Sequence, residues 1–211
     1  RTWKALPGTA IEGKTITQIT DAKLLTQTQA TALAIQEANT PKIFHIASHA
    51  YYLPPEENKI ENPLLRSGIV LAGANNQEDN DQDDGYLTAL EVTKLDLEGT
   101  QMVVVSGCES GQGDINSGEG VYGLKRAIAV AGARSSLLSL WKVDDAATAA
   151  FMESFYQKLK DGQGRADALL ETQKDFREKK IKSGDSRMDW SEPYYWAAFQ
   201  LSGDWTPIEG L

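Results

Sequence analysis

Cysteine is almost absent from this sequence, since its 211 residues include only Cys108. An intramolecular disulfide is therefore excluded, and so is a zinc site built from several cysteines. A chain so poor in cysteine is typical of a reducing compartment, and we expect a cytoplasmic location. A single cysteine in such a chain is a candidate nucleophile when a histidine accompanies it; the alternative is a small buried apolar residue.

Long apolar runs are lacking as well. No stretch of about 18 apolar residues occurs, so we expect neither a membrane span nor a membrane partner. The chain opens with RTWKALPG and has no initiating Met and no signal-like segment. We therefore expect residues 1–211 to form a single domain within a longer polypeptide.

Positive charge is scarce relative to negative charge. The chain has 21 Lys and Arg against 30 Asp and Glu, which gives a net charge of −9. Such a chain repels phosphate backbones, so a nucleic-acid partner is not expected, whereas a protein substrate with a basic residue fits. A hydrophobic content of 41% indicates a globular domain with a proper core.

What the sequence does contain is a series of short apolar runs that alternate with helical patterns. Buried strands are predicted at 43–47, 68–72, 102–105, 135–141 and 196–202, and a further short strand at 13–20. Helices are predicted at 21–39, 121–131, 146–160 and 165–180. This alternation predicts an α/β fold with a mostly parallel sheet.

Two reactive side chains follow two of these strands. His49 comes just after 43–47, and Cys108 comes just after 102–105. If the two strands are parallel neighbours, both side chains lie at the same edge of the sheet. An imidazole there can take the proton of the thiol, since the thiolate is the nucleophile. The backbone N–H groups of Ala50 and Cys108 are then candidates for an oxyanion hole.

Two other patterns could indicate a metal site or a dinucleotide site, but the residues around each of them argue against it. His45 and His49 lie four residues apart, but on a predicted strand and without a third ligand nearby, so we expect His45 in the core and no metal. Residues 118–123 match the dinucleotide motif G-x-G-x-x-G. No strand directly precedes it and Glu119 would repel a pyrophosphate, so we expect a loop that enters a helix, and no cofactor.

Several segments together resemble the CHAT-domain peptidases of the caspase–separase clan, a family common in bacteria and often found behind TPR repeats. The segments are HIASHA, DGYLTALEV, VVVSGCESGQG, SGEGVYGLKRAIAVAGARSSLLSLWKVDDAAT and PYYWAAFQLSGDW. The resemblance implies a caspase-like three-layer α/β/α sandwich with a mostly parallel central sheet. It implies a thiol endopeptidase that cleaves a regulatory protein, with His49 and Cys108 as the catalytic pair. The alternative is a catalytically silent CHAT interaction or scaffold module.

The resemblance also implies a substrate-binding segment and partners. The segment at 141–145, WKVDD, is similar to the part of separases in which an acidic residue receives a basic side chain from P1, the residue before the cleaved bond. Asp145 is matched to that role, with Trp141 and Leu140 beside it; a capping aspartate for the helix that follows is the alternative. Lys142 departs from the acidic residue of separases, and Ala50 from the usual Gly. TPR repeats or other regulatory domains, in this chain or a partner, are the expected partners.

Overall fold

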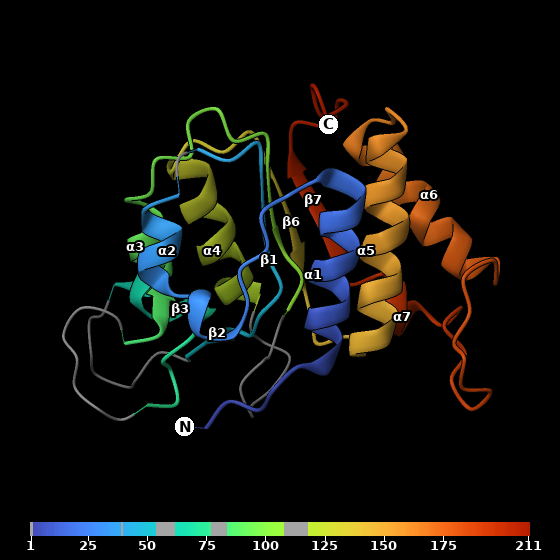
Figure 1. Ribbon diagram of the computed structural model, residues 1–211, viewed down its shortest axis with the longest axis horizontal. Coiled ribbons are helices and arrows are strands. Elements are labelled where there is room, and N and C mark those ends of the chain that lie inside the picture. Colours follow the sequence, from blue (N-terminus) through green and yellow to red (C-terminus); the bar gives the residue numbers. More distant parts are fainter. Residues whose placement is uncertain (1, 39, 54–61, 77–83, 108–117) are drawn as a thin grey trace.

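The central layer of the protein is a four-stranded sheet. The computed structural model describes residues 2–38, 40–53, 62–76, 84–107 and 118–211 (Figure 1). The sheet has the order β1-β5-β6-β7, in which β1, β5 and β6 are parallel and β7 is antiparallel. These strands are β1 (Ile43–Ile46), β5 (Met102–Val105), β6 (Ser135–Ser139) and β7 (Phe199–Gly203). Parallel strands send their carboxyl ends to the same edge.

Helices cover both faces of this sheet. Figure 1 shows one helical layer on each side. The first layer consists of α1 (Pro7–Thr20), α5 (Asp145–Lys160), α6 (Arg165–Arg177) and α7 (Pro193–Trp196). The second consists of α2 (Ala32–Gln36), α3 (Ala89–Val92) and α4 (Gly118–Val130), with the short turns η1 (Gln27–Gln29) and η2 (Pro63–Leu65).

Strand β5 shows why the sequence folds into three layers. Its four residues are all buried, so an apolar run replaces the alternation of a half-exposed strand. Met102 and Val104 belong to the core under α1, α5 and α6, whereas Val103 and Val105 belong to the core under α3 and α4. Successive side chains of a strand point to opposite faces, so one strand supplies both cores. The expected α/β/α sandwich with a mostly parallel central sheet is confirmed.

A second, smaller sheet lies beside the central one. It is antiparallel and has the order β2-β3-β4, with β2 (Ala50–Tyr52), β3 (Ser67–Val70) and β4 (Tyr86–Thr88). The side chain of Ser48 joins the two sheets, because its hydroxyl donates to the carbonyl of Val70 at 2.5 Å. The chain therefore leaves β1, passes His49 and enters the small sheet directly.

The predicted strand at 13–20 is wrong, because these residues form most of α1. The segment has the two-residue alternation of a strand, but Pro7 starts a helix, and Gly8, Glu12 and Ile16 form its buried stripe. A Cβ at Gly8 would lie 2.5 Å from the Cβ of Asp145, so the glycine lets α1 pack closely on α5. Packing against α5 outweighs the weak helix propensity of the Thr and Ile residues.

The predicted long helix at 21–39 is also largely wrong. The chain leaves α1 at Asp21, which has a φ of 55° and whose N–H donates to the carbonyl of Thr17. Residues 21–29 are all exposed, and among the described residues 21–38 only η1 and the five-residue α2 are helical. A segment that buries no stripe gains nothing from tertiary packing, and short helices are marginal without it.

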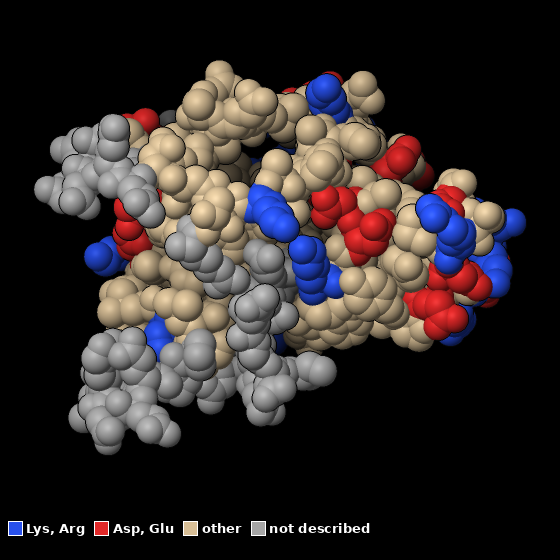
Figure 2. Space-filling model, turned by 90° about the horizontal axis from the view of Figure 1, so that it is seen from below, with Lys and Arg blue, Asp and Glu red and all other residues tan. Residues whose placement is uncertain are grey.

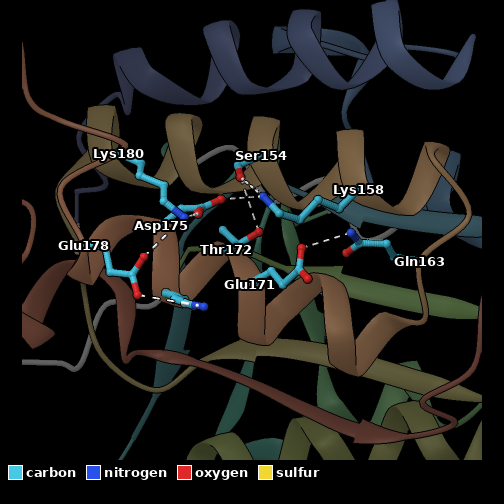
Figure 3. Close-up of polar contacts among 9 residues, drawn as sticks. Ser154, Lys158, Gln163, Glu171, Thr172, Asp175, Glu178 and Lys180 are labelled. Atoms are coloured by element: carbon cyan, nitrogen blue, oxygen red, sulfur yellow. Dashed lines mark hydrogen bonds and ion pairs between the residues drawn. The ribbon is translucent and has the colours of Figure 1, made fainter.

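Polar contacts fix α6 against α5 on the outside of the first layer (Figure 3). Lys158 of α5 donates to Asp175 of α6 at 2.9 Å, and Lys180 reaches the same carboxylate at 3.1 Å. Burial opposes ionisation of Asp175, but the hydrogen bonds and charges of the two lysines outweigh it and lower its pKa.

Among the described residues, no helix is both long and apolar enough to cross a bilayer.

Candidate functional site

The ends of β1 and β5 bring two distant parts of the chain together. The strands pair in register up to Ile46 and Val105, and the N–H of Ser106 donates to the carbonyl of Ile46 at 3.2 Å. The two chain segments therefore stay side by side for at least one residue beyond the ends of the strands. These are Ser48 and His49 on one side and Ser106 and Gly107 on the other.

Gly107 lies against the backbone that carries His49. A Cβ at Gly107 would lie 1.8 Å from the carbonyl oxygen of Ser48 and 3.4 Å from the backbone nitrogen of His49. Contacts below 3 Å are not tolerated, so no other residue fits here without separating the two strands. The glycine that precedes Cys108 thus allows closest approach of its strand to the histidine; Cys108 itself lies outside the described residues.

The imidazole of His49 is held in one orientation. The side chain is 7% exposed, and its Nε2 lies 2.7 Å from the carbonyl oxygen of Lys4. A carbonyl only accepts, so Nε2 carries the proton, and in the neutral ring the lone pair is on Nδ1. The indole of Trp3 packs against the imidazole with ring centroids 5.2 Å apart. The contacts of Nε2 and of the ring face therefore fix how the imidazole is oriented.

The segment that supplies the carbonyl of Lys4 is tied to the small sheet. Trp3 donates its N–H to Asn75 at 2.7 Å, and its indole N–H donates to the hydroxyl of Tyr86 at 3.0 Å. Asn75 donates back to the carbonyl of Trp3 at 2.9 Å. Sequence reasoning missed Trp3 and Lys4, and for Lys4 no signal existed, because every residue has a backbone carbonyl.

Ala50 presents its N–H away from its partner strand. It pairs with Ile69, and the ladder bonds beside it join Val70 to His49 and Leu53 to Arg66. Hydrogen-bonded and non-hydrogen-bonded pairs alternate in antiparallel sheets, so Ala50 and Ile69 are a non-hydrogen-bonded pair. The N–H of Ala50 therefore points off β2, on the side opposite β3.

A pocket opens between His49 and the first turns of α1 and α5. Its lining residues are Leu6, Thr9, Glu12, His49, Ser106, Gly107, Lys142, Val143, Asp145 and Thr148. They come from the ends of β1 and β5, from one face of α1 and from the start of α5. Figure 2 shows the molecule from below, the end at which the residues following β1 and β5 lie. On this face, basic and acidic side chains reach the surface next to one another.

The three residues matched to substrate binding have different surroundings. Asp145 is half-buried and lines the pocket. Trp141 donates its indole N–H to the carbonyl of Tyr194 at 3.0 Å and packs on the core, and Leu140 is 40% exposed. Neither Leu140 nor Trp141 is a lining residue of this pocket. Their role in binding remains a prediction.

The cap of α5 is Asp144 rather than Asp145. Its carboxylate accepts from the N–H groups of Ala146 and Ala147 at 3.1 and 3.0 Å. Asp145 is the first residue of the helix and points to the pocket instead. The capping alternative for Asp145 is therefore wrong, since the neighbouring aspartate does that work.

This division of roles predicts different effects on stability. We expect Asp144→Ala to lower the free energy of unfolding by about 1 kcal/mol, because two helix N–H groups lose their acceptor. Asp145→Asn should cost only about 0.3 kcal/mol, the loss of a weak charge–dipole interaction at a helix end. Urea unfolding of both variants measures this, and equal losses would contradict the assignment.

The remaining motifs are placed as follows. His45 lies on β1 with both ring nitrogens hydrogen-bonded, Nδ1 with the hydroxyl of Tyr156 at 2.9 Å and Nε2 with Glu12 at 2.8 Å. It is thus part of the interior, as expected. The G-x-G-x-x-G stretch at 118–123 lies entirely within α4. A dinucleotide motif needs its glycines in the turn between strand and helix, so the stretch does not form one.

Comparison with known proteins places the chain among its relatives. The CHAT domain family model matches residues 1–204. Tetratricopeptide repeat protein 28 of Homo sapiens is 36% identical over 117 residues, and its counterpart in Mus musculus is 32% identical over 117 residues. Each match covers 56% of this chain but 4% of the relative, so the chain spans a small part of these proteins.

Proposed function

The chain belongs to the CHAT domain family, and from that membership we propose that it is a cysteine endopeptidase with Cys108 as nucleophile and His49 as general base. CHAT domains are related to caspase-like cysteine peptidases. A regulatory protein is the proposed substrate, because the relatives are large repeat proteins rather than isolated digestive enzymes.

The observation that carries the proposal is the close approach of Gly107 to Ser48 and His49. Cys108 is bonded to Gly107, and consecutive Cα atoms are about 3.8 Å apart across a trans peptide bond. Because Cys108 directly follows Gly107, its backbone lies close to that of His49, and its thiol is expected within reach of the imidazole. The strand register supports the pairing independently, because it aligns the ends of β1 and β5.

The reaction follows from the orientation of His49. Nδ1 of the imidazole takes the thiol proton, and the sulfur attacks the carbonyl carbon of the substrate. Nε2–H keeps its bond to the carbonyl of Lys4, which favours the imidazolium that forms. The proton then passes to the leaving amine, and water hydrolyses the thioester. The N–H of Ala50, which is not used by β3, and that of Cys108 are the proposed donors to the oxyanion.

The pocket beside His49 is the proposed site for the P1 side chain. Asp145 lines it and is released from capping by Asp144, which supports a basic P1 residue. We also propose that residues 1–211 are one domain of a longer protein and that TPR repeats, in the same or a partner chain, control it. The names of the relatives support the proposed link to TPR repeats.

A peptide-library digest tests this function. The chain is incubated with a mixed peptide library, and mass spectrometry maps the bonds that are cut. We expect cuts after a restricted set of residues in which Arg and Lys predominate, and we expect prior treatment with iodoacetamide to stop them. A chain that cuts nothing, alone or with its TPR partner supplied, would favour the silent interaction module instead.

A further inference from the structure

Glu12 is a buried acidic side chain that the proposed mechanism does not use. It lies on α1 and is 2% exposed, and it is one of the residues that line the pocket beside His49. Removing a carboxylate from water is costly unless it is paired and hydrogen-bonded. A buried carboxylate at a pocket wall therefore calls for an explanation.

Only half of this carboxylate is satisfied by the protein. Oε1 lies 2.8 Å from Nε2 of His45, and among the described residues Oε2 has no hydrogen-bond partner. A carboxylate has room for about four hydrogen bonds, so the second oxygen retains its full accepting capacity. Because Glu12 lines the pocket, a donor that enters the pocket can reach it.

The contacts behind Glu12 orient its carboxylate. Burial, and beyond it the Glu12 carboxylate, raise the pKa of Tyr156 well above its usual value, so the phenol stays protonated. It can then donate to Nδ1 of His45 at 2.9 Å, which leaves Nε2 to carry the ring proton that faces Glu12. His45 and Tyr156 therefore hold Oε1 of Glu12 from behind and leave Oε2 toward the pocket.

The pocket has one further acidic side chain and one basic side chain. Asp145 adds a second carboxylate, and Lys142 is an exposed ammonium. Two carboxylic acid side chains against one lysine give the lining a formal net charge of −1 when histidine is not counted. Thr9 and Thr148 add hydroxyl groups that can accept further hydrogen bonds from a guanidinium or an ammonium.

We propose that Glu12 is the principal specificity residue of this pocket and binds the cationic head of an arginine or lysine side chain of the substrate. Oε2 of Glu12 accepts hydrogen bonds from the cationic head, while His45, backed by Tyr156, holds Oε1. The proposal rests on the proposed function in that it identifies the occupant as a P1 residue, and it transfers the main role from Asp145 to Glu12.

Binding of two matched small ligands tests the proposal without any cleavage. The probes are N-acetyl-arginine amide and N-acetyl-citrulline amide, which have nearly the same shape but differ in charge. Titration of the Cys108→Ala chain, followed by NMR or calorimetry, gives both dissociation constants. We expect the arginine ligand to bind about tenfold tighter or better. Glu12→Gln should remove this preference and leave citrulline binding unchanged.

Two further variants make the outcome decisive. Glu171→Gln on α6, which removes an exposed carboxylate that accepts from Gln163, controls for overall charge and should keep the preference. If Glu12→Gln does not fold by circular dichroism, Glu12→Asp keeps the charge but withdraws it by one methylene, and should weaken only the arginine ligand, severalfold.

The possible results separate this inference from the proposed function. Equal binding of both ligands to the unmutated pocket, or a preference that survives the Glu12 variants, would overturn the role of Glu12 even if peptides are cut. A preference that depends on Glu12 in a chain that cuts no peptide would keep the cation site and remove the peptidase.

Discussion

We expect the Cys108→Ala chain to cut no peptide at all, and the His49→Ala chain to cut about 10²–10⁴-fold more slowly than the unmodified chain. Cys108 supplies the only thiol of the sequence, so no other side chain can replace it as a sulfur nucleophile. In the proposed mechanism, His49 is the base that ionises this thiol. Because the two act as a unit, the double variant should be no slower than Cys108→Ala alone.

Thermal unfolding distinguishes a catalytic effect from a structural one here. The melting temperature of Cys108→Ala should stay within a few degrees of the original, since the substitution removes only one heavy atom, the sulfur. His49 packs against Trp3, so some loss of stability is expected in His49→Ala. If Cys108→Ala still cuts the same bonds, or unfolds at the assay temperature, the assignment of the nucleophile fails.

Gly107→Ala should have the second largest effect. The new Cβ would lie 1.8 Å from the carbonyl oxygen of Ser48 and 2.7 Å from its carbonyl carbon, and both neighbours are backbone atoms that cannot rotate away. The ends of β1 and β5 would have to separate. We expect a loss of about 3 kcal/mol in the free energy of unfolding. A shift of about 1 Å between nucleophile and base should also slow cleavage about 10²-fold.

Gly184→Ala is the matched control for this variant. A Cβ at Gly184 has no atom within 4 Å among its surroundings, so the substitution should leave both stability and cleavage nearly unchanged. Urea unfolding and peptide cleavage are measured for both variants. A Gly107→Ala chain that behaves like Gly184→Ala would mean that β1 and β5 do not meet as closely at this edge as described.

The sequence predicted the framework of the sheet well, for a simple reason. Apolar runs such as 102–105 are buried on both faces, and such runs differ clearly from the polar segments around them. The start of α3 at Thr88 has a similarly local signature, because its hydroxyl and Glu91, three residues on, form a capping box. Local patterns and burial on both faces therefore carried the α/β assignment and the strands of the central sheet.

The first forty residues were predicted poorly, because tertiary packing decides their structure. The alternation at 13–20 is that of a strand, but α5 offers a surface on which one helical stripe is buried. The close packing needs Gly8 opposite Asp145, a relation between residues far apart in the sequence. No periodicity within either segment indicates it.

The site was predictable only in part for a similar reason. His49 could be found because a histidine at a strand end has a recognisable chemistry. The carbonyl of Lys4 and the buried oxygen of Glu12 could not, because the first is present in every residue and the second lies on α1, a helix that the sequence did not predict. Glu12 lies on α1, and Lys4 lies in the segment before it.

The rate of alkylation of Cys108 by iodoacetamide, measured from pH 5 to pH 9 in the unmodified chain and in His49→Ala, tests the central claim most directly. An ordinary thiol reaches half of its maximal rate near pH 8.5, because the thiolate is the reactive form. The pairing of His49 with Cys108 predicts half-maximal rate at a clearly lower pH in the unmodified chain and a return to about pH 8.5 in His49→Ala. Identical profiles for the two proteins would contradict the pairing.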